Sequence, residues 1–158
     1  MEDARREGLR VTLDQYPYQA GSTVITALLP GWVLAGGREQ TIERLNDPRI
    51  RVKIKEYFLL EKEELLINET GWENIMINSL PVYNELEQKS LEELGEIVQK
   101  EPLEAFLDLV IKTRGEGTVV LFDQSREDWQ RIFTDPYCSI ASDSILVGDK
   151  PHPRSFGT

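Results

Sequence analysis

Two short apolar runs near the carboxyl end of the chain have the length and composition of buried strands. The first is Val-Val-Leu-Phe at residues 119–122, and the second, at residues 138–141, runs into Ser142 and Asp143. Residues 125–133 between them are amphipathic at helical spacing, which gives the order strand, helix, strand. This order favours parallel strands, and α/β proteins usually place functional polar groups at the carboxyl ends of such strands. Asp143 is therefore a candidate acid or metal ligand, although aspartate is also a common turn residue.

The amino end of the chain has a related pattern. Residues 1–9 have the pattern of the last turns of a helix that stops at Gly8, and a strand is expected from Arg10 or Val11 onward. A polar loop rich in aromatic residues follows at residues 14–23.

The stretch from residue 24 to residue 116 is too long for an ordinary loop and must contain structure of its own. Asp47 is expected to cap one helix, and Ser90 with Glu93 forms the pattern of a capping box at the start of another. The helices expected here cover residues 38–45, 48–62, 90–99 and 103–112, with a loop at 63–71 and a strand at 72–77.

These patterns together predict an α/β chain in three segments. They are a strand and loop at residues 1–23, a mostly helical insertion at 24–116, and a strand, helix and strand at 117–158. The insertion acts either as a lid that contacts substrate or as a packing appendage.

The composition of the chain argues against some classes of partner but does not identify a function. The chain has 158 residues and a net charge of -10, which argues against a nucleic-acid partner because such partners require clustered Lys and Arg. No apolar run has the length of a membrane span, so no membrane partner is expected. The single cysteine, Cys138, excludes an internal disulfide and predicts a reducing, cytoplasmic compartment, with the thiol buried as a small apolar group.

Three sequence blocks are similar to those of a known family. They are D-Q-Y-P-Y-Q-A-G-S-T at residues 14–23, S-D at 142–143, and H-P-R-S-F-G-T at 152–158. In this order they match the D-x-Y-P-Y-x-A-G-S-T, S-D and H-P-R-x-x-G-T patterns of the N-acyl-D-amino-acid deacylases (D-aminoacylases). This family belongs to the metal-dependent amidohydrolase superfamily, and the resemblance extends over most of the chain. The first and third blocks are specific as a pair, whereas S-D alone is not.

The resemblance implies that the chain carries the last two strands of a TIM-type (β/α)8 barrel and the insertion between them. The rest of the barrel would precede Met1, and its closing helices would follow Thr158. The whole protein would be a zinc enzyme. It would hydrolyse N-acyl-D-amino acids, or related N-acyl amino acids and dipeptides, to a carboxylate and a free amino acid.

The resemblance also implies roles for four residues. Asp143 would transfer the proton and contact the water bound to the metal, whereas Tyr16, Ser22 and Arg154 would bind the carboxylate of the substrate. Arginine suits this task because its guanidinium donates two parallel hydrogen bonds to a carboxylate. The structural alternatives are a core position for Tyr16, a turn for Ser22 and a solvated side chain for Arg154.

The metal ligands are expected to lie outside this chain. A zinc site takes three or four converging ligands, but the only histidine here, His152, lies in the H-P-R turn. We therefore expect the isolated chain to bind no zinc and to be catalytically incomplete. Ala141 and Ser144 stand where the family more often has glycine, and neither difference removes a functional group.

An alternative from another class is a non-enzymatic binding module. It would dock a partner through the insertion helices and anchor an acidic group at Arg154. For a fragment of a barrel, we also expect a mixed α+β fold that self-associates, because strands cut from a barrel expose their edges and an apolar face. The residues expected on that face are Val11, Leu13, Val119, Leu121, Ile140 and Ala141.

Overall fold

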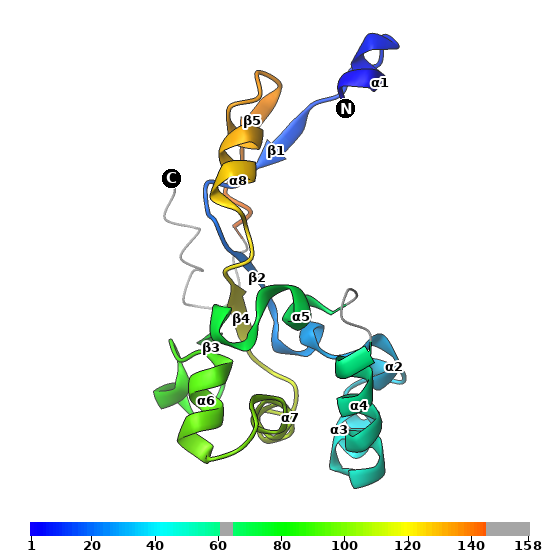
Figure 1. Ribbon diagram of the computed structural model, residues 1–158, viewed down its shortest axis with the longest axis vertical. Coiled ribbons are helices and arrows are strands. Elements are labelled where there is room, and N and C mark those ends of the chain that lie inside the picture. Colours follow the sequence, from blue (N-terminus) through cyan, green and yellow to red (C-terminus); the bar gives the residue numbers. More distant parts are fainter. Residues whose placement is uncertain (61–64, 145–158) are drawn as a thin grey trace. The chain divides into compact units, whose positions relative to one another are not determined.

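The computed structural model describes residues 1–60 and 65–144, which form two units (Figure 1). The first unit comprises Met1–Gln19 and the described residues from Gln124 onward, and the second comprises Ala20–Asp123. The second unit is thus inserted into the sequence of the first. Both contain helices and strands, so the chain is mixed α/β, as predicted.

The first unit is built on two short parallel strands. Its elements are α1 (Glu2–Arg6), β1 (Leu13–Gln15), α8 (Arg126–Phe133) and β5 (Cys138–Ile140). β1 pairs with β5, and Leu13 lies opposite Cys138. Ser125 caps α8 by accepting a hydrogen bond from the backbone of Asp128 at 3.3 Å. The helix predicted at residues 125–133 is therefore present as α8. The strand expected from Arg10 or Val11 begins only at Leu13.

The predicted parallel pairing of the two strands that flank α8 is wrong. β4 (Thr118–Leu121), which precedes α8, pairs antiparallel with β2 and β3, whereas β5 pairs with β1 in a separate sheet. A local order of strand, helix and strand does not specify the partner of each strand. Here the second unit supplies the partners of β4 on both of its edges.

The second unit contains a three-stranded antiparallel sheet in the order β2-β4-β3. β2 spans Gly21–Val24, and β3 spans Ile75–Ser79. Alternate residues of β3 and β4 are buried, among them Ile77 and Val119, so one face of the sheet is covered by the core.

Helices complete the second unit, and most of them form where the sequence predicts them. The capping box of α6 is present, with the Ser90 hydroxyl and the Glu93 carboxylate each accepting a hydrogen bond from the other's backbone. The helices and 3₁₀ turns of this unit are η1 (Ile25–Leu28), α2 (Gly31–Leu34), α3 (Arg38–Asn46), α4 (Pro48–Leu60), α5 (Leu66–Thr70), η2 (Trp72–Asn74), η3 (Asn84–Leu86), α6 (Leu91–Val98) and α7 (Pro102–Lys112).

Two local predictions for this unit are corrected. Residues 66–70, expected in a loop, form α5, in which Ile67 is buried against the core. The strand expected from Trp72 begins only at Ile75, because residues 72–74 form a 3₁₀ turn. In both places a few apolar residues fit helix and strand patterns equally well, and tertiary packing selects one.

The buried hydrophobic core lies entirely within the second unit. Every buried apolar side chain among the described residues belongs to Ala20–Asp123, and these side chains form one cluster. Val119 and Leu121 belong to this cluster, which corrects their expected exposure. Cys138 is half-buried, which corrects the prediction of a buried thiol, and Ile140 is 60% exposed.

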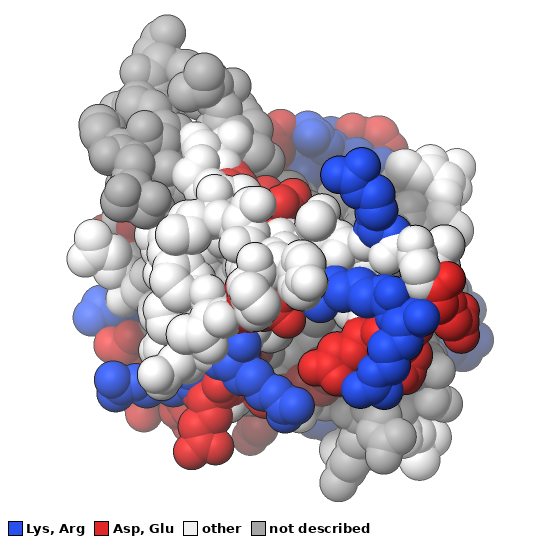
Figure 2. All heavy atoms as spheres, turned by 90° about the horizontal axis from the view of Figure 1, so that it is seen from above, with Lys and Arg blue, Asp and Glu red and all other residues white. Residues whose placement is uncertain are grey.

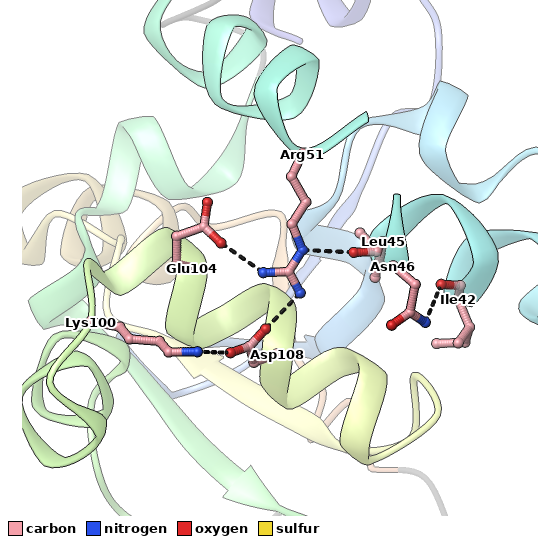
Figure 3. A network of polar contacts seen from close by, with 7 residues as sticks. All are labelled: Ile42, Leu45, Asn46, Arg51, Lys100, Glu104 and Asp108. Carbon is pink, nitrogen blue, oxygen red and sulfur yellow. Dashed lines mark hydrogen bonds and ion pairs between the residues drawn. The ribbon is translucent and has the colours of Figure 1, made fainter. Parts of the chain in front are cut away.

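A network of charged groups connects α4 with α7 in the second unit (Figure 3). The guanidinium of Arg51 donates to Glu104 at 2.7 Å and to Asp108 at 2.6 Å, and its Nε donates to the carbonyl of Leu45. Asp108 also accepts from Lys100. Burial disfavours the charge on Asp108, but the hydrogen bonds from Lys100 and Arg51 outweigh it and lower the pKa of this carboxyl.

Acidic and basic side chains are interspersed on the face of the molecule shown in Figure 2. Among the residues that the structure describes, no helix combines the length and the apolarity that a membrane span requires.

Candidate functional site

The candidate site lies where β1 and β5 end, at an edge that we call the β1–β5 edge. Gln15, the last residue of β1, is paired with Ile140, the last residue of β5. The pairing continues for one more residue, because the backbone NH of Ala141 donates to the carbonyl of Gln15 at 3.1 Å. Since the strands are parallel, the residues that follow both strands lie at the same edge.

Tyr16 follows β1 directly and is held by two side chains from the other segment of the first unit. Its hydroxyl accepts a hydrogen bond from the amide of Gln124, and its backbone carbonyl accepts one from the indole NH of Trp129 at 3.2 Å. The ring also stacks on Tyr18, with 6.1 Å between the centroids. Tyr16 is half-buried, so its ring is neither a core residue nor free in solvent.

Asp143 follows β5 by three residues and is exposed. Its backbone has a φ of 50°, in the left-handed region that aspartate tolerates better than most residues do. Ala141 and Ser144 are absent from the positive-φ residues of the described chain, so neither position needs glycine for its backbone. The departure from the family pattern at these two positions is therefore compatible with the observed turn.

The structure brings two of the four predicted site residues, Tyr16 and Asp143, to the β1–β5 edge. Ser22 lies on β2 in the second unit, where it is half-buried and paired with Val120. Arg154 and His152 lie outside the described residues.

Gln124 and Trp129 are the residues of this site that the sequence did not indicate. Gln124 lies just after β4, and Trp129 lies on α8, more than a hundred positions from Tyr16. The only signal in the sequence was the position of Trp129 within an amphipathic helix, which predicts a packing role. Only the close approach of α8 to the loop after β1 shows that both residues fix Tyr16.

Within residues 1–60 and 65–144, no three side chains of His, Cys, Asp or Glu converge as a metal site would require. The residues at 1–60 and 65–144 therefore do not provide a zinc site by themselves. Asp143 is a carboxylate that both the sequence and the fold place at the β1–β5 edge.

The groups that the two strand ends supply are a carboxylate, from Asp143, and an oriented phenol, from Tyr16. A carboxylate at a strand end can accept and return a proton, and a phenol can donate a hydrogen bond to an anionic oxygen. Tyr16 follows β1 directly, and Asp143 follows β5 by three residues.

No family model and no curated protein sequence matches the chain. Solved structures do match it. One is an N-acyl-D-glutamate deacylase from Bordetella bronchiseptica in complex with zinc and a phosphonate inhibitor that mimics the tetrahedral intermediate of the reaction. It has a TM-score of 0.59 and 18% sequence identity over 99% of this chain.

Two structures of D-aminoacylase match as well. One, described as defining a novel subset of amidohydrolases, has a TM-score of 0.55 and 23% identity. The other, from work on the binuclear metal centre of D-aminoacylase, has a TM-score of 0.54 and 24% identity. Each match covers 99% of this chain and 24% of the other chain, so this chain spans about a quarter of their length. Over nearly all of its residues, the chain therefore shares the fold of one segment of the N-acyl-D-amino-acid deacylases.

Proposed function

We propose that this chain is part of a metal-dependent amidohydrolase that hydrolyses N-acyl-D-amino acids or related N-acyl amino acids. The products are a carboxylate and a free amino acid. The observation that carries the proposal is the β1–β5 edge, where Tyr16 and Asp143 follow two parallel, paired strands. The three sequence blocks and the fold of the matched deacylases support the same assignment.

In this proposal β1 and β5 are neighbouring strands of a TIM-type barrel, and β4 belongs to the second unit and not to the barrel. Barrel strands are parallel to their neighbours, and catalytic residues of such barrels lie at the carboxyl ends of the strands. The burial pattern supports this role for the first unit. Its strands carry half-buried or exposed side chains, among them Leu13 and Ile140, as expected of strands whose neighbours come from elsewhere in a longer protein.

Each residue has a defined part in the reaction. Asp143 accepts a proton from the attacking water and returns it to the leaving nitrogen, because an amide nitrogen leaves only after protonation. Tyr16 and Arg154 hold the carboxylate of the substrate, with Arg154 as the bidentate partner, and the role that the resemblance implies for Ser22 stays a prediction. Gln124 and Trp129 keep Tyr16 in position through its hydroxyl and its carbonyl.

The metal is held by residues outside this chain. The deacylase from Bordetella bronchiseptica contains zinc, and one D-aminoacylase structure concerns a binuclear metal centre. By analogy the cofactor of the longer protein is zinc, which would polarise the scissile carbonyl when bound. The described residues of this chain supply no such ligand set.

The test is the substitution Asp143→Asn in the longer protein that contains this chain. We expect kcat for N-acyl-D-amino acids to fall by about a hundredfold or more, because the acid–base group is lost while its shape is kept. Asp128→Asn is the matched control, since Asp128 is an exposed carboxylate of the same unit in the first turn of α8. Turnover of Asp143→Asn at the rate of the control would remove Asp143 from the reaction.

A further inference from the structure

The second unit contains a cavity of about 270 Å³ beside α6 and α7. This volume lies just below the range of pockets that hold drug-sized ligands, so it suits a small molecule. Its lining residues are Tyr83, Leu86, Leu94, Val98, Lys100, Ala105, Asp108, Leu109 and Lys112.

The floor of the cavity is apolar. Leu94 of α6 and Ala105 and Leu109 of α7 line it, and each is at most 3% exposed and belongs to the core. On α7 the lining residues recur at helical spacing from Ala105 to Lys112, so they form one stripe about 10 Å long. Val98 is 38% exposed and forms part of the rim.

The charged groups of the cavity differ in how far they are neutralised. Asp108 accepts from both Lys100 and Arg51, and Arg51 also pairs with Glu104, so these four groups balance one another (Figure 3). Lys112 lies at the other end of the α7 stripe and forms no ion pair with any residue that the structure describes. One end of the cavity thus carries an exposed lysine whose charge no described carboxylate pairs with.

Tyr83 adds an aromatic wall at the same end. Tyr83 is 40% exposed, and the ammonium of Lys112 lies 5.8 Å from the centroid of its ring. Its backbone has a φ of 66°, an unfavourable conformation for a bulky side chain, and its carbonyl accepts a hydrogen bond from Leu86 at 2.9 Å. Such strain in a residue that lines a cavity is typical of ligand-binding segments.

We propose that this cavity binds a small amphiphilic carboxylate. The apolar body of the ligand lies on Leu94, Ala105 and Leu109, and its carboxylate pairs with Lys112. The ring of Tyr83 covers the end of the apolar body next to that carboxylate. This assignment concerns the second unit and does not depend on the proposed deacylase activity.

The test uses hexanoate and the uncharged hexanamide as probes, with binding followed by backbone amide NMR of the full chain. Hexanoate is expected to shift the amides of Leu94, Ala105 and Leu109 saturably. Lys112→Met should lower the affinity for hexanoate by about fivefold or more, because the charged partner is lost. It should leave the affinity for hexanamide unchanged. Lys53→Met is the matched control, because Lys53 is an exposed lysine on α4 away from the lining residues.

A second variant separates the aromatic wall from the charge. Tyr83→Gly removes the ring and also relieves the left-handed backbone, so it should fold at least as well as the parent chain. This variant is expected to lower the affinity for hexanoate and the affinity for hexanamide by the same factor. The proposal is overturned if hexanoate does not bind saturably, or if it shifts amides elsewhere. It is also overturned if Lys112→Met binds hexanoate as the Lys53→Met control does, or if Tyr83→Gly binds both probes as the parent does.

Discussion

At the scale of single residues, Tyr16 shows how a candidate site residue is fixed by positions distant in sequence. Gln124 orients its hydroxyl, and Trp129 holds its carbonyl. Asp143 is placed differently, by a turn in the left-handed region after β5. The sequence indicates the chemistry of both residues, because carboxylates and phenols after apolar runs are recognisable. The partners that hold Tyr16 are not recognisable, because hydrogen bonds between distant segments leave no local pattern.

The role of Arg154 can be tested by a substitution that keeps its charge. Arg154→Lys in the longer protein should raise KM for the free acid by about tenfold, because an ammonium cannot form the two parallel hydrogen bonds of a guanidinium. Arg10→Lys, at an exposed position before β1, is the matched control. Esters of the same substrates should discriminate little between the two variants. A KM for the free acid equal to that of the control would remove Arg154 from carboxylate binding.

At the scale of elements, the positions predicted best are those with a local physical signal. The capping box at Ser90 and the proline at the start of α7 mark helix starts, because they satisfy or dispense with unpaired backbone NH groups. α5 carries no such cap, and the sequence pattern does not predict this helix. The pattern also does not predict the two sheet partners of β4, because strand pairing depends on segments far apart in the sequence.

Packing decides whether replacing Gly95 with alanine stabilises or destabilises the chain. In a helix, alanine is usually more stable than glycine, but a Cβ at Gly95 would lie 2.9 Å from the carbonyl oxygen of Lys100. Gly95→Ala should therefore destabilise the chain by about 1–3 kcal/mol through overpacking. Gly31→Ala is the control, since a Cβ there meets nothing within 4 Å, and it should stabilise by about 0.5 kcal/mol. Urea unfolding measures both, and a stabilising Gly95→Ala would show that the end of α6 can move.

At the scale of the whole molecule, apolar burial is uneven between the two units. The described core lies in the second unit, and its network of Arg51, Glu104, Asp108 and Lys100 ties α4 to α7. The first unit relies on hydrogen bonds, aromatic stacking and the contacts of Arg5. That guanidinium lies 3.9 Å from the centroid of the Tyr137 ring, and its Nε donates to the carbonyl of Val11. The second unit is therefore expected to be the more stable of the two.

The charged network predicts how stability depends on pH. The pKa of Asp108 is lowered in the folded chain, so its contribution is fully present above the unfolded value of about 4 and is lost as the pH falls toward the folded value. Asp108→Asn should lower the free energy of unfolding by about 1–2 kcal/mol at pH 7, and by less at about pH 3. Urea unfolding at both values measures this, with Asp14→Asn, an exposed carboxylate on β1, as the control. An equal cost of Asp108→Asn at both values would contradict the assignment.

Self-association of the isolated chain is the second prediction at this scale. Among the described residues, β1 and β5 pair only with each other, and Ile140 on β5 is 60% exposed. Strand edges of this kind pair with other chains. Light scattering should show a mass that rises with concentration, and Ile140→Lys should reduce it. Val52→Lys, at a residue 58% exposed on α4, should have little effect. A concentration-independent monomer mass for the parent chain would show that these edges are satisfied within it.

The sequence by itself determined most helices, the long insertion and the chemical character of the candidate site. These features depend on local signals: the period of apolar residues, capping residues, proline positions and short blocks of specific residues. Only the tertiary structure decided that β5 pairs with β1 and β4 with β2 and β3, and that Gln124 and Trp129 hold Tyr16. It also decided that Val119 and Leu121 are buried. The physical reason is that strand pairing and burial depend on which distant segments meet, and a pattern along the chain specifies the face of an element but not the surface that covers it.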